Sequence, residues 1–148
     1  MPTLSLVTFL ICSIPLAVMD IRERRLPNGL NALLAIGGVA GHAYRSISDQ
    51  TWQPLLSSIL GGLVGLGFML MLWGVSRGGL GMGDVKLVGA LGCSIADAMA
   101  LFVAVALAFV IAALWALVNL VRRRCTRRSR LAFGPFILLG AWLVVALP

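Results

Sequence analysis

Long apolar runs separated by short polar loops are the feature that most constrains how this chain can fold. Of its 148 residues, 60% are hydrophobic and 11% are charged, a balance foreign to soluble globular domains. A helix needs roughly 20 apolar residues to cross a hydrocarbon core about 30 Å thick. The sequence therefore predicts an all-α, polytopic membrane bundle that forms a single domain over residues 1–148. Its six expected transmembrane helices are residues 3–19, 28–44, 54–75, 85–97, 98–120 and 131–147.

The first apolar run, Thr3 to Met19, has no basic residue before it and no A-x-A site after it. A secretory signal peptide carries both features. We therefore expect this run to be retained as a membrane span.

The basic residues predict how the bundle is oriented, because cytoplasmic loops hold back Lys and Arg during insertion. With both termini outside, eleven of the twelve Lys and Arg residues fall on the cytoplasmic side, and Arg45 alone falls outside. The eleven are Arg22, Arg24, Arg25, Arg77, Lys86, Arg122, Arg123, Arg124, Arg127, Arg128 and Arg130. The cluster 122–130 is expected to contact anionic lipid. Because these residues sit between apolar runs and not on a polar face, the net charge of +7 does not indicate nucleic-acid binding.

Residues 85–120 form one nearly unbroken apolar stretch, which could be one long helix or two helices hinged near Ser94–Asp97. Two helices keep the basic cluster inside, whereas one would put it outside. The fourth helix then has about 13 residues, roughly 20 Å, and is too short to span. We expect it to start below the membrane surface in a wet cavity lined by protein, with Asp84 at that recessed start.

Small residues recur at four-residue spacing on three of these segments, which predicts close helix packing in a compact bundle. They are Gly37 and Gly41, Gly61 and Gly65, and Ala104, Ala108, Ala112 and Ala116. Three single cysteines, Cys12, Cys93 and Cys125, lack CxxC spacing and so indicate neither a zinc site nor a disulfide framework.

Only five residues are acidic, and on this topology Asp20 and Asp84 lie at the cytoplasmic ends of spans. Ionisable groups are costly there and are therefore usually functional. The plain alternative for Asp20 is an ion pair with the arginines of the following turn, Arg22 to Arg25. We expect Asp49 and Asp97 to be loop or span-end residues on the outer side.

Each of these two aspartates sits in a short motif. Asp20 precedes a basic turn that ends in Pro27 and Asn28, which predict the next helix start, with Asn28 as its cap. Asp84 belongs to Gly78-Gly-Leu-Gly-Met-Gly-Asp-Val-Lys86, whose glycines permit positive φ and the close approach of an extended peptide. A turn capped by Asp84 is the alternative. Lys86 either stabilises ionised Asp84 or meets a lipid phosphate.

Two carboxylates that share a proton can activate water to hydrolyse a peptide bond, one as base and one as acid. The sole histidine, His42, falls near the outer end of its span, away from any Ser or Cys nucleophile on the inner side. The motifs therefore favour aspartic protease chemistry and call for no metal or cofactor.

The chain resembles the prepilin peptidases, intramembrane aspartic proteases of the GxGD type. The resemblance rests on Asp20-x-Arg-x-x-x-Leu-Pro-Asn28, on Gly81-Met-Gly83-Asp84-Val-Lys86 and on Phe133-Gly-Pro-Phe136 before the last apolar run. It implies a catalytic pair, Asp20 and Asp84, in the bacterial cytoplasmic (inner) membrane. Gly81, Gly83, Lys86, Pro27 and Asn28 would support the site or the substrate. The expected substrates are prepilins or pseudopilins, cut behind a short basic leader at the cytoplasmic face.

Two departures from the family pattern refine this expectation. Longer family members carry an extra cytoplasmic domain with paired CxxC motifs and also N-methylate the new terminus, and this chain has neither the insert nor those cysteines. It resembles the short branch associated with Flp-type tight-adherence pili, so methyltransferase activity is not expected. Leu26 stands where Ile is frequent, a volume-conserving change. A small transporter and a non-catalytic pilus or secretion assembly factor remain as alternatives.

Overall fold

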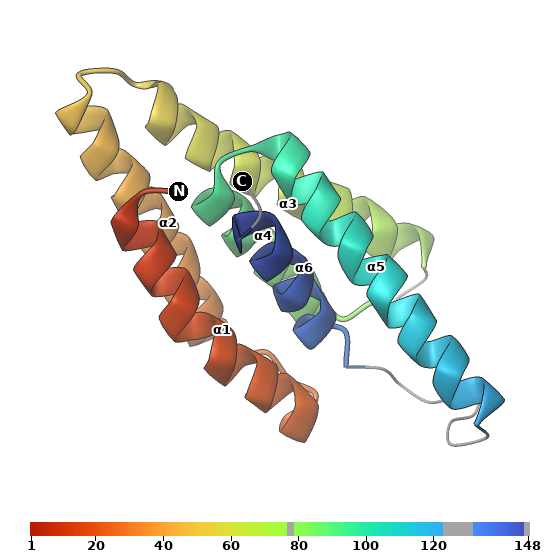
Figure 1. Ribbon diagram of the computed structural model, residues 1–148. Coiled ribbons are helices and arrows are strands. Elements are labelled where there is room, and N and C mark those ends of the chain that lie inside the picture. Colours follow the sequence, from red (N-terminus) through yellow and green to blue (C-terminus); the bar gives the residue numbers. More distant parts are fainter. Residues whose placement is uncertain (77–78, 123–131, 147–148) are drawn as a thin grey trace.

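The computed structural model describes residues 1–76, 79–122 and 132–146, and these form six α-helices (Figure 1). The helices are α1 (Thr3–Glu23), α2 (Asn28–Ser48), α3 (Gln53–Val75), α4 (Met82–Ile95), α5 (Ala98–Val121) and α6 (Gly134–Ala146). The all-helical fold class is confirmed, and each helix overlaps its predicted segment. Arg77, Gly78, Cys125 and most of the basic cluster 122–130 lie outside the described residues.

Three of the helices, α1, α3 and α5, are long and apolar enough to cross a membrane on their own. Helix α2 has 21 residues but carries more polar groups, whereas α4 has 14 residues and α6 has 13. The chain is therefore a membrane protein in which the remaining three helices depend on the others for a place in the bundle.

The stretch from 85 to 120 is indeed two helices. Helix α4 ends at Ile95, and Ala96 takes a left-handed conformation with φ of 55°. The N–H of Ala96 donates to the carbonyl oxygen of Gly92 at 2.9 Å. Asp97 then caps α5, because its side chain accepts a hydrogen bond from the Ala100 N–H at 3.1 Å. The hinge predicted near Ser94–Asp97 is thus confirmed.

Helix α4 is the centre of the bundle and contacts all five other helices. In Figure 1 it lies behind α6, with α1 and α2 on one side and α3 and α5 on the other. Nine of its residues are buried, from Asp84 to Ser94. A helix too short to span therefore has almost no surface that must face lipid.

Close approach of helix backbones at glycine holds α4 in place. A side chain on Gly61 of α3 would lie 2.5 Å from the carbonyl oxygen of Gly92 on α4. In the same way, a side chain on Gly92 would collide with the carbonyl oxygen of Gly61. On the other side of the bundle, Gly140 of α6 lies against the backbone of Ala104 on α5. The close packing predicted from the small-residue stripes is confirmed except at the last position of the alanine stripe, because Ala116 is exposed.

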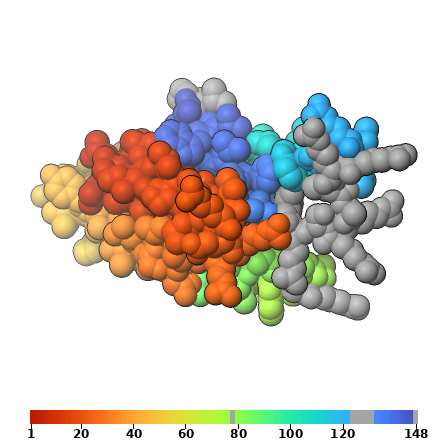
Figure 2. Space-filling model, turned by 90° about the horizontal axis from the view of Figure 1, so that it is seen from below, coloured from red at the N-terminus to blue at the C-terminus, as the bar shows by residue number. Residues whose placement is uncertain are grey.

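The bundle has two distinct ends. At one end α1, α3 and α5 finish and α2, α4 and α6 begin, and we call it the aspartate end because Asp20 and Asp84 lie there. Figure 2 looks onto the lower side of the view in Figure 1, where the orange end of α1 and start of α2 lie next to the green segment around residue 80.

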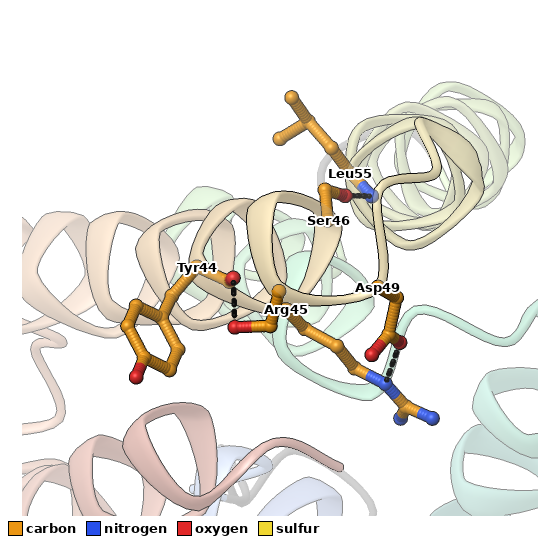
Figure 3. A network of polar contacts seen from close by, with 6 residues as sticks. Tyr44, Arg45, Ser46, Asp49 and Leu55 are labelled. Carbon is orange, nitrogen blue, oxygen red and sulfur yellow. Dashed lines mark hydrogen bonds and ion pairs between the residues drawn. The ribbon is translucent and has the colours of Figure 1, made fainter.

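The opposite end contains the turn from α2 to α3, and we call it the far end (Figure 3). Here the Arg45 guanidinium pairs with the Asp49 carboxylate at 3.2 Å, and the Leu55 N–H donates to the Ser46 hydroxyl oxygen at 3.0 Å. Asp49 and Asp97 are therefore helix-end residues at the far end, as expected.

We predict that Gly61→Ala lowers the free energy of unfolding by about 1–3 kcal/mol, because its Cβ would push α3 away from α4. Gly67→Ala on the same helix is the matched control, since nothing lies within 4 Å of the added carbon. Thermal unfolding of both variants in the same detergent measures the difference. Equal melting temperatures would contradict the packing described here.

Candidate active site

Asp20 lies in the last turn of α1 and is 6% exposed. Its backbone carbonyl oxygen accepts a hydrogen bond from the Arg24 N–H at 3.0 Å. Arg24 adopts a left-handed conformation, with φ of 51°, that is uncommon for a residue with a side chain. This turn ends α1 at Glu23, and the chain then turns back toward the start of α2. Strained backbone of this kind often clusters at functional sites.

The Asp20 carboxylate is held by the last helix of the chain. Its Oδ2 accepts a hydrogen bond from the Gly134 N–H at 2.9 Å, within the buried interior. Gly134 is the first residue of α6, where backbone N–H groups have no partner inside the helix and attract negative charge. A side chain on Gly134 would lie 2.7 Å from the same oxygen. Glycine therefore allows the contact to form.

The ion pair considered for Asp20 does not form in the described part of the chain. The ion pair found there joins Arg45 and Asp49, at the far end of the bundle. Arg22, Arg24 and Arg25 have exposed side chains, whereas Asp20 is buried against α6. The plain interfacial ion pair is therefore the wrong interpretation of this aspartate.

Asp84 lies in the first turn of α4 and is 8% exposed. Its N–H donates to the carbonyl oxygen of Gly81, the residue before the helix, at 3.1 Å. A side chain on Gly81 would lie 2.9 Å from Oδ2 of Asp84, so the carboxylate folds back over this glycine. Gly81 has φ of −72°. Its role here is to make room for Asp84, and the positive φ that glycine permits is not used.

The two aspartates line one cavity of about 360 Å³ at the aspartate end. They come from different helices, α1 and α4. Most of the site residues predicted from the sequence line the same cavity: Asp20, Asn28, Gly81, Gly83, Asp84 and Lys86. Pro27 precedes α2 and sets the start of that helix. The cavity also contains two arginines that the sequence did not single out for the site, Arg24 and Arg25.

The loop after α1 packs directly onto the start of α4. A side chain on Gly83 would lie 3.1 Å from Cβ of Leu26, which is tighter than an ordinary contact. The second glycine of the Gly-x-Gly-Asp motif thus lets the α1–α2 loop approach α4, and this contact brings Asp20 and Asp84 to the same cavity.

Lys86 donates a hydrogen bond to Oδ1 of Asn28 at 2.9 Å. Within the described residues it forms no ion pair with Asp84. The prediction that Asn28 caps α2 is wrong, because Pro27 occupies the cap position and no side-chain cap bond forms at this helix start. The Asn28 oxygen instead bonds to Lys86, which joins α2 to α4 at the rim of the cavity.

Gly134 is a further residue of this site to which the sequence analysis assigned no role. It belongs to the late Phe133-Gly-Pro-Phe136 segment, far along the chain from Asp20. Position in the sequence gives no sign of which helix start will meet which carboxylate. The packing of α1 against α6 reveals the partner.

The arrangement supports acid–base chemistry by two carboxylates. When two carboxyl groups are close, they do not both ionise readily, so one can accept a proton while the other donates one. Such a pair can activate a water molecule against a carbonyl carbon. Within residues 1–76, 79–122 and 132–146, no group of three or more His, Cys, Asp or Glu side chains is arranged to hold a metal ion.

Comparison with known proteins supports a peptidase function. Residues 6–117 match the model of the type IV leader peptidase family, and the match includes both aspartates and the Gly81–Lys86 segment. No curated protein and no solved structure gives a significant match. Since the family model covers most of the chain, the protein belongs to the type IV leader peptidase family.

Proposed function

We propose that this peptidase is an intramembrane aspartic endopeptidase that removes the short basic leader of prepilins or pseudopilins at the cytoplasmic face. The observation that carries the proposal is the cavity shared by Asp20 and Asp84 in a chain of the leader peptidase family. They are the two buried acidic residues among the five that the chain contains. We assign them as the catalytic pair.

In the proposed reaction, one carboxylate takes a proton from a water molecule whose oxygen bonds to the scissile carbonyl carbon. The other carboxylic acid donates its proton to the carbonyl oxygen, which gives a tetrahedral gem-diol. The carbon–nitrogen bond then breaks as the leaving amine takes the proton that the first carboxylate had accepted, and one hydroxyl of the diol returns a proton to the second carboxylate. The Gly134 N–H fixes Oδ2 of Asp20, which leaves the other oxygen of that carboxyl group for the water or for Asp84.

Charge distribution supports a cytoplasmic location for the site. The described Lys and Arg residues at the aspartate end are Arg22, Arg24, Arg25, Lys86 and Arg122, whereas Arg45 lies at the far end. Arg45 is paired there with Asp49 (Figure 3), so the far end presents little free positive charge. Positive loops remain in the cytoplasm. This charge distribution supports an orientation with both termini outside in the inner membrane.

The proposed substrate is supported by the family and by the cysteine pattern of the sequence. The chain has no paired CxxC motif, in keeping with the short branch that serves Flp-type tight-adherence pili and does not methylate its product. The cavity lies at the aspartate end, where α1 ends and α4 begins. A substrate helix that leaves the membrane there would present to the two aspartates the bond between its leader and its apolar segment.

We predict that Asp20→Asn and Asp84→Asn each reduce leader cleavage by at least about a hundredfold, because each removes one partner of the proton transfer. Asp97→Asn is the matched control, since Asn also caps helices and Asp97 lies at the far end. The purified variants are incubated in lipid with a tagged prepilin, and the new N-terminus is mapped. Cleavage at the normal rate by either variant would exclude the two-aspartate mechanism. An assembly factor would bind the precursor and leave it uncut.

We also predict that Gly134→Ala lowers cleavage by about tenfold or more, because the added Cβ would displace the Asp20 carboxylate from its backbone partner. Gly29→Ala serves as control, since it adds the same carbon near the cavity with nothing within 4 Å. The rate constants of the two variants are compared at saturating precursor. If both retain the parent rate, α6 does not position Asp20.

The orientation is tested by cysteine labelling in a variant whose three native cysteines are replaced by alanine. Glu23→Cys and Thr51→Cys place exposed thiols at the aspartate end and the far end, respectively. A membrane-impermeant thiol reagent added outside intact cells should label position 51, and position 23 should be labelled only after the membrane is opened. The reverse pattern would put the site outside the cytoplasm.

A further inference from the structure

A groove runs along the bundle between α2, α3 and α4 and starts beside the aspartate cavity. Its volume is about 460 Å³, and on α2 it extends from Asn28 to Val39. At 1.5 Å per residue this distance is about 16 Å, which is about half of a hydrocarbon core. The groove therefore has the length of about three turns of a helix.

The walls of the groove are largely apolar. On α3 they include the apolar side chains of Ile59, Leu63 and Leu66, which are exposed on the surface of the bundle. On α2 the small side chains of Ala32 and Ala35 leave the space open. Such a surface suits an apolar segment that lies in the membrane beside the bundle.

The groove and the aspartate cavity share two residues, Asn28 and Lys86. These two side chains are hydrogen-bonded to each other at 2.9 Å, so they mark the junction between the two spaces. A peptide that leaves the cavity at this junction enters the groove directly.

Asn31 lines the groove one turn beyond Asn28 and is only 4% exposed. Within the described residues, neither its Nδ2 nor its Oδ1 has a hydrogen-bond partner. Other buried polar groups of the bundle are satisfied: His42 Nε2 and Ser94 Oγ both bond to backbone carbonyl oxygens. Since buried polar groups are nearly always paired, the unpaired amide indicates a partner that binds here.

A substrate of the proposed reaction has backbone groups that could serve as hydrogen-bond partners for this amide. The peptide bond to be cut must be unwound from a helix, and the first turn of the apolar helix behind it has backbone N–H groups without partners. In apolar surroundings such N–H groups need hydrogen-bond acceptors, which the enzyme has to supply. An Asn side chain offers two donors and one acceptor, so it can bond to both kinds of backbone group.

We infer that the groove binds the first turns of the apolar segment that follows the cleavage point, with the Asn31 amide hydrogen-bonded to its backbone. The inference rests on the proposed function and adds where the substrate lies in the enzyme. A lipid acyl chain, which has no backbone amide, is the competing occupant. The two occupants are separated by photo-crosslinking.

The first test places a photoreactive amino acid at Leu63 in the full chain with Asp84→Asn, so that bound precursor is not consumed. The probe is a tagged precursor with a basic leader and an apolar segment, in lipid vesicles. Crosslinks should map to the first turns of the apolar segment. The same amino acid at Leu114, exposed on α5, is the control and should give at least about tenfold less product. Equal yields at both positions, or adducts with lipid alone, would overturn the inference.

The second test uses Asn31→Leu, which replaces the unpaired amide by an apolar group of similar size. It should lower the crosslinking yield from position 63 by about tenfold, the loss expected for a hydrogen bond in apolar surroundings. The melting temperature should stay equal or rise, because the Asn31 amide has no hydrogen bond to lose within the described part of the chain. A lower melting temperature with unchanged crosslinking would show that Asn31 is merely structural.

The third test fills the groove. Ala35→Phe should reduce the crosslinking yield by about tenfold, whereas Ala40→Phe, on an exposed part of α2 outside the groove, should not. Equal yields from the two variants would overturn the inference. Cleavage by the unmodified chain is measured in parallel: a precursor that is cut but never crosslinked at position 63 refutes the groove alone, and one that is crosslinked but never cut refutes the proposed protease activity.

Discussion

The structure depends on keeping one short helix, α4, out of contact with lipid. Its 14 residues extend about 21 Å at 1.5 Å per residue, which is less than the hydrocarbon core of a bilayer. Backbone groups at its ends would meet lipid if the helix stood alone. All five other helices contact it, and glycine pairs such as Gly61 and Gly92 let them approach closely. This enclosure produces an interior helix start, and Asp84 lies on its first turn.

A second contact joins the beginning of the chain to its end. The hydrogen bond from the Gly134 N–H to the Asp20 carboxylate brings the start of α6 beside the last turn of α1. Both helices also contact α4. The carboxylate of Asp20 is thus held by a backbone group, which cannot rotate as a side chain does. A positioned carboxyl group of this kind suits proton transfer, where small displacements are costly.

The two ends of the bundle differ in how their polar side chains are paired. At the far end, Arg45 and Asp49 pair, and Asp97 caps a helix. At the aspartate end, in contrast, Asn31 has no hydrogen-bond partner among the residues that the structure describes. An unsatisfied buried group costs about 1–3 kcal/mol. Natural proteins accept such local costs mainly at sites that bind or react, which agrees with the groove beginning at the aspartate cavity.

The sequence by itself determined the number of helices, the hinge before Asp97 and the placement of Asp20 and Asp84 at the same end of the bundle. These follow from apolar run lengths and from the positions of Lys and Arg, which are local properties of the chain. It also pointed to Gly81 and Gly83, although it did not show that one makes room for Asp84 and the other for Leu26.

Only the tertiary structure decided that the two aspartates share a cavity, that Gly134 holds Asp20, and that Lys86 bonds to Asn28 and not to Asp84. Each of these contacts joins different helices. They depend on how each helix is rotated about its axis and how closely its neighbours approach, which long-range packing sets. Hydropathy and charge along the chain determine neither the rotation nor the approach of the helices. The sequence therefore indicated the residues of the site, whereas the contacts between them required the tertiary structure.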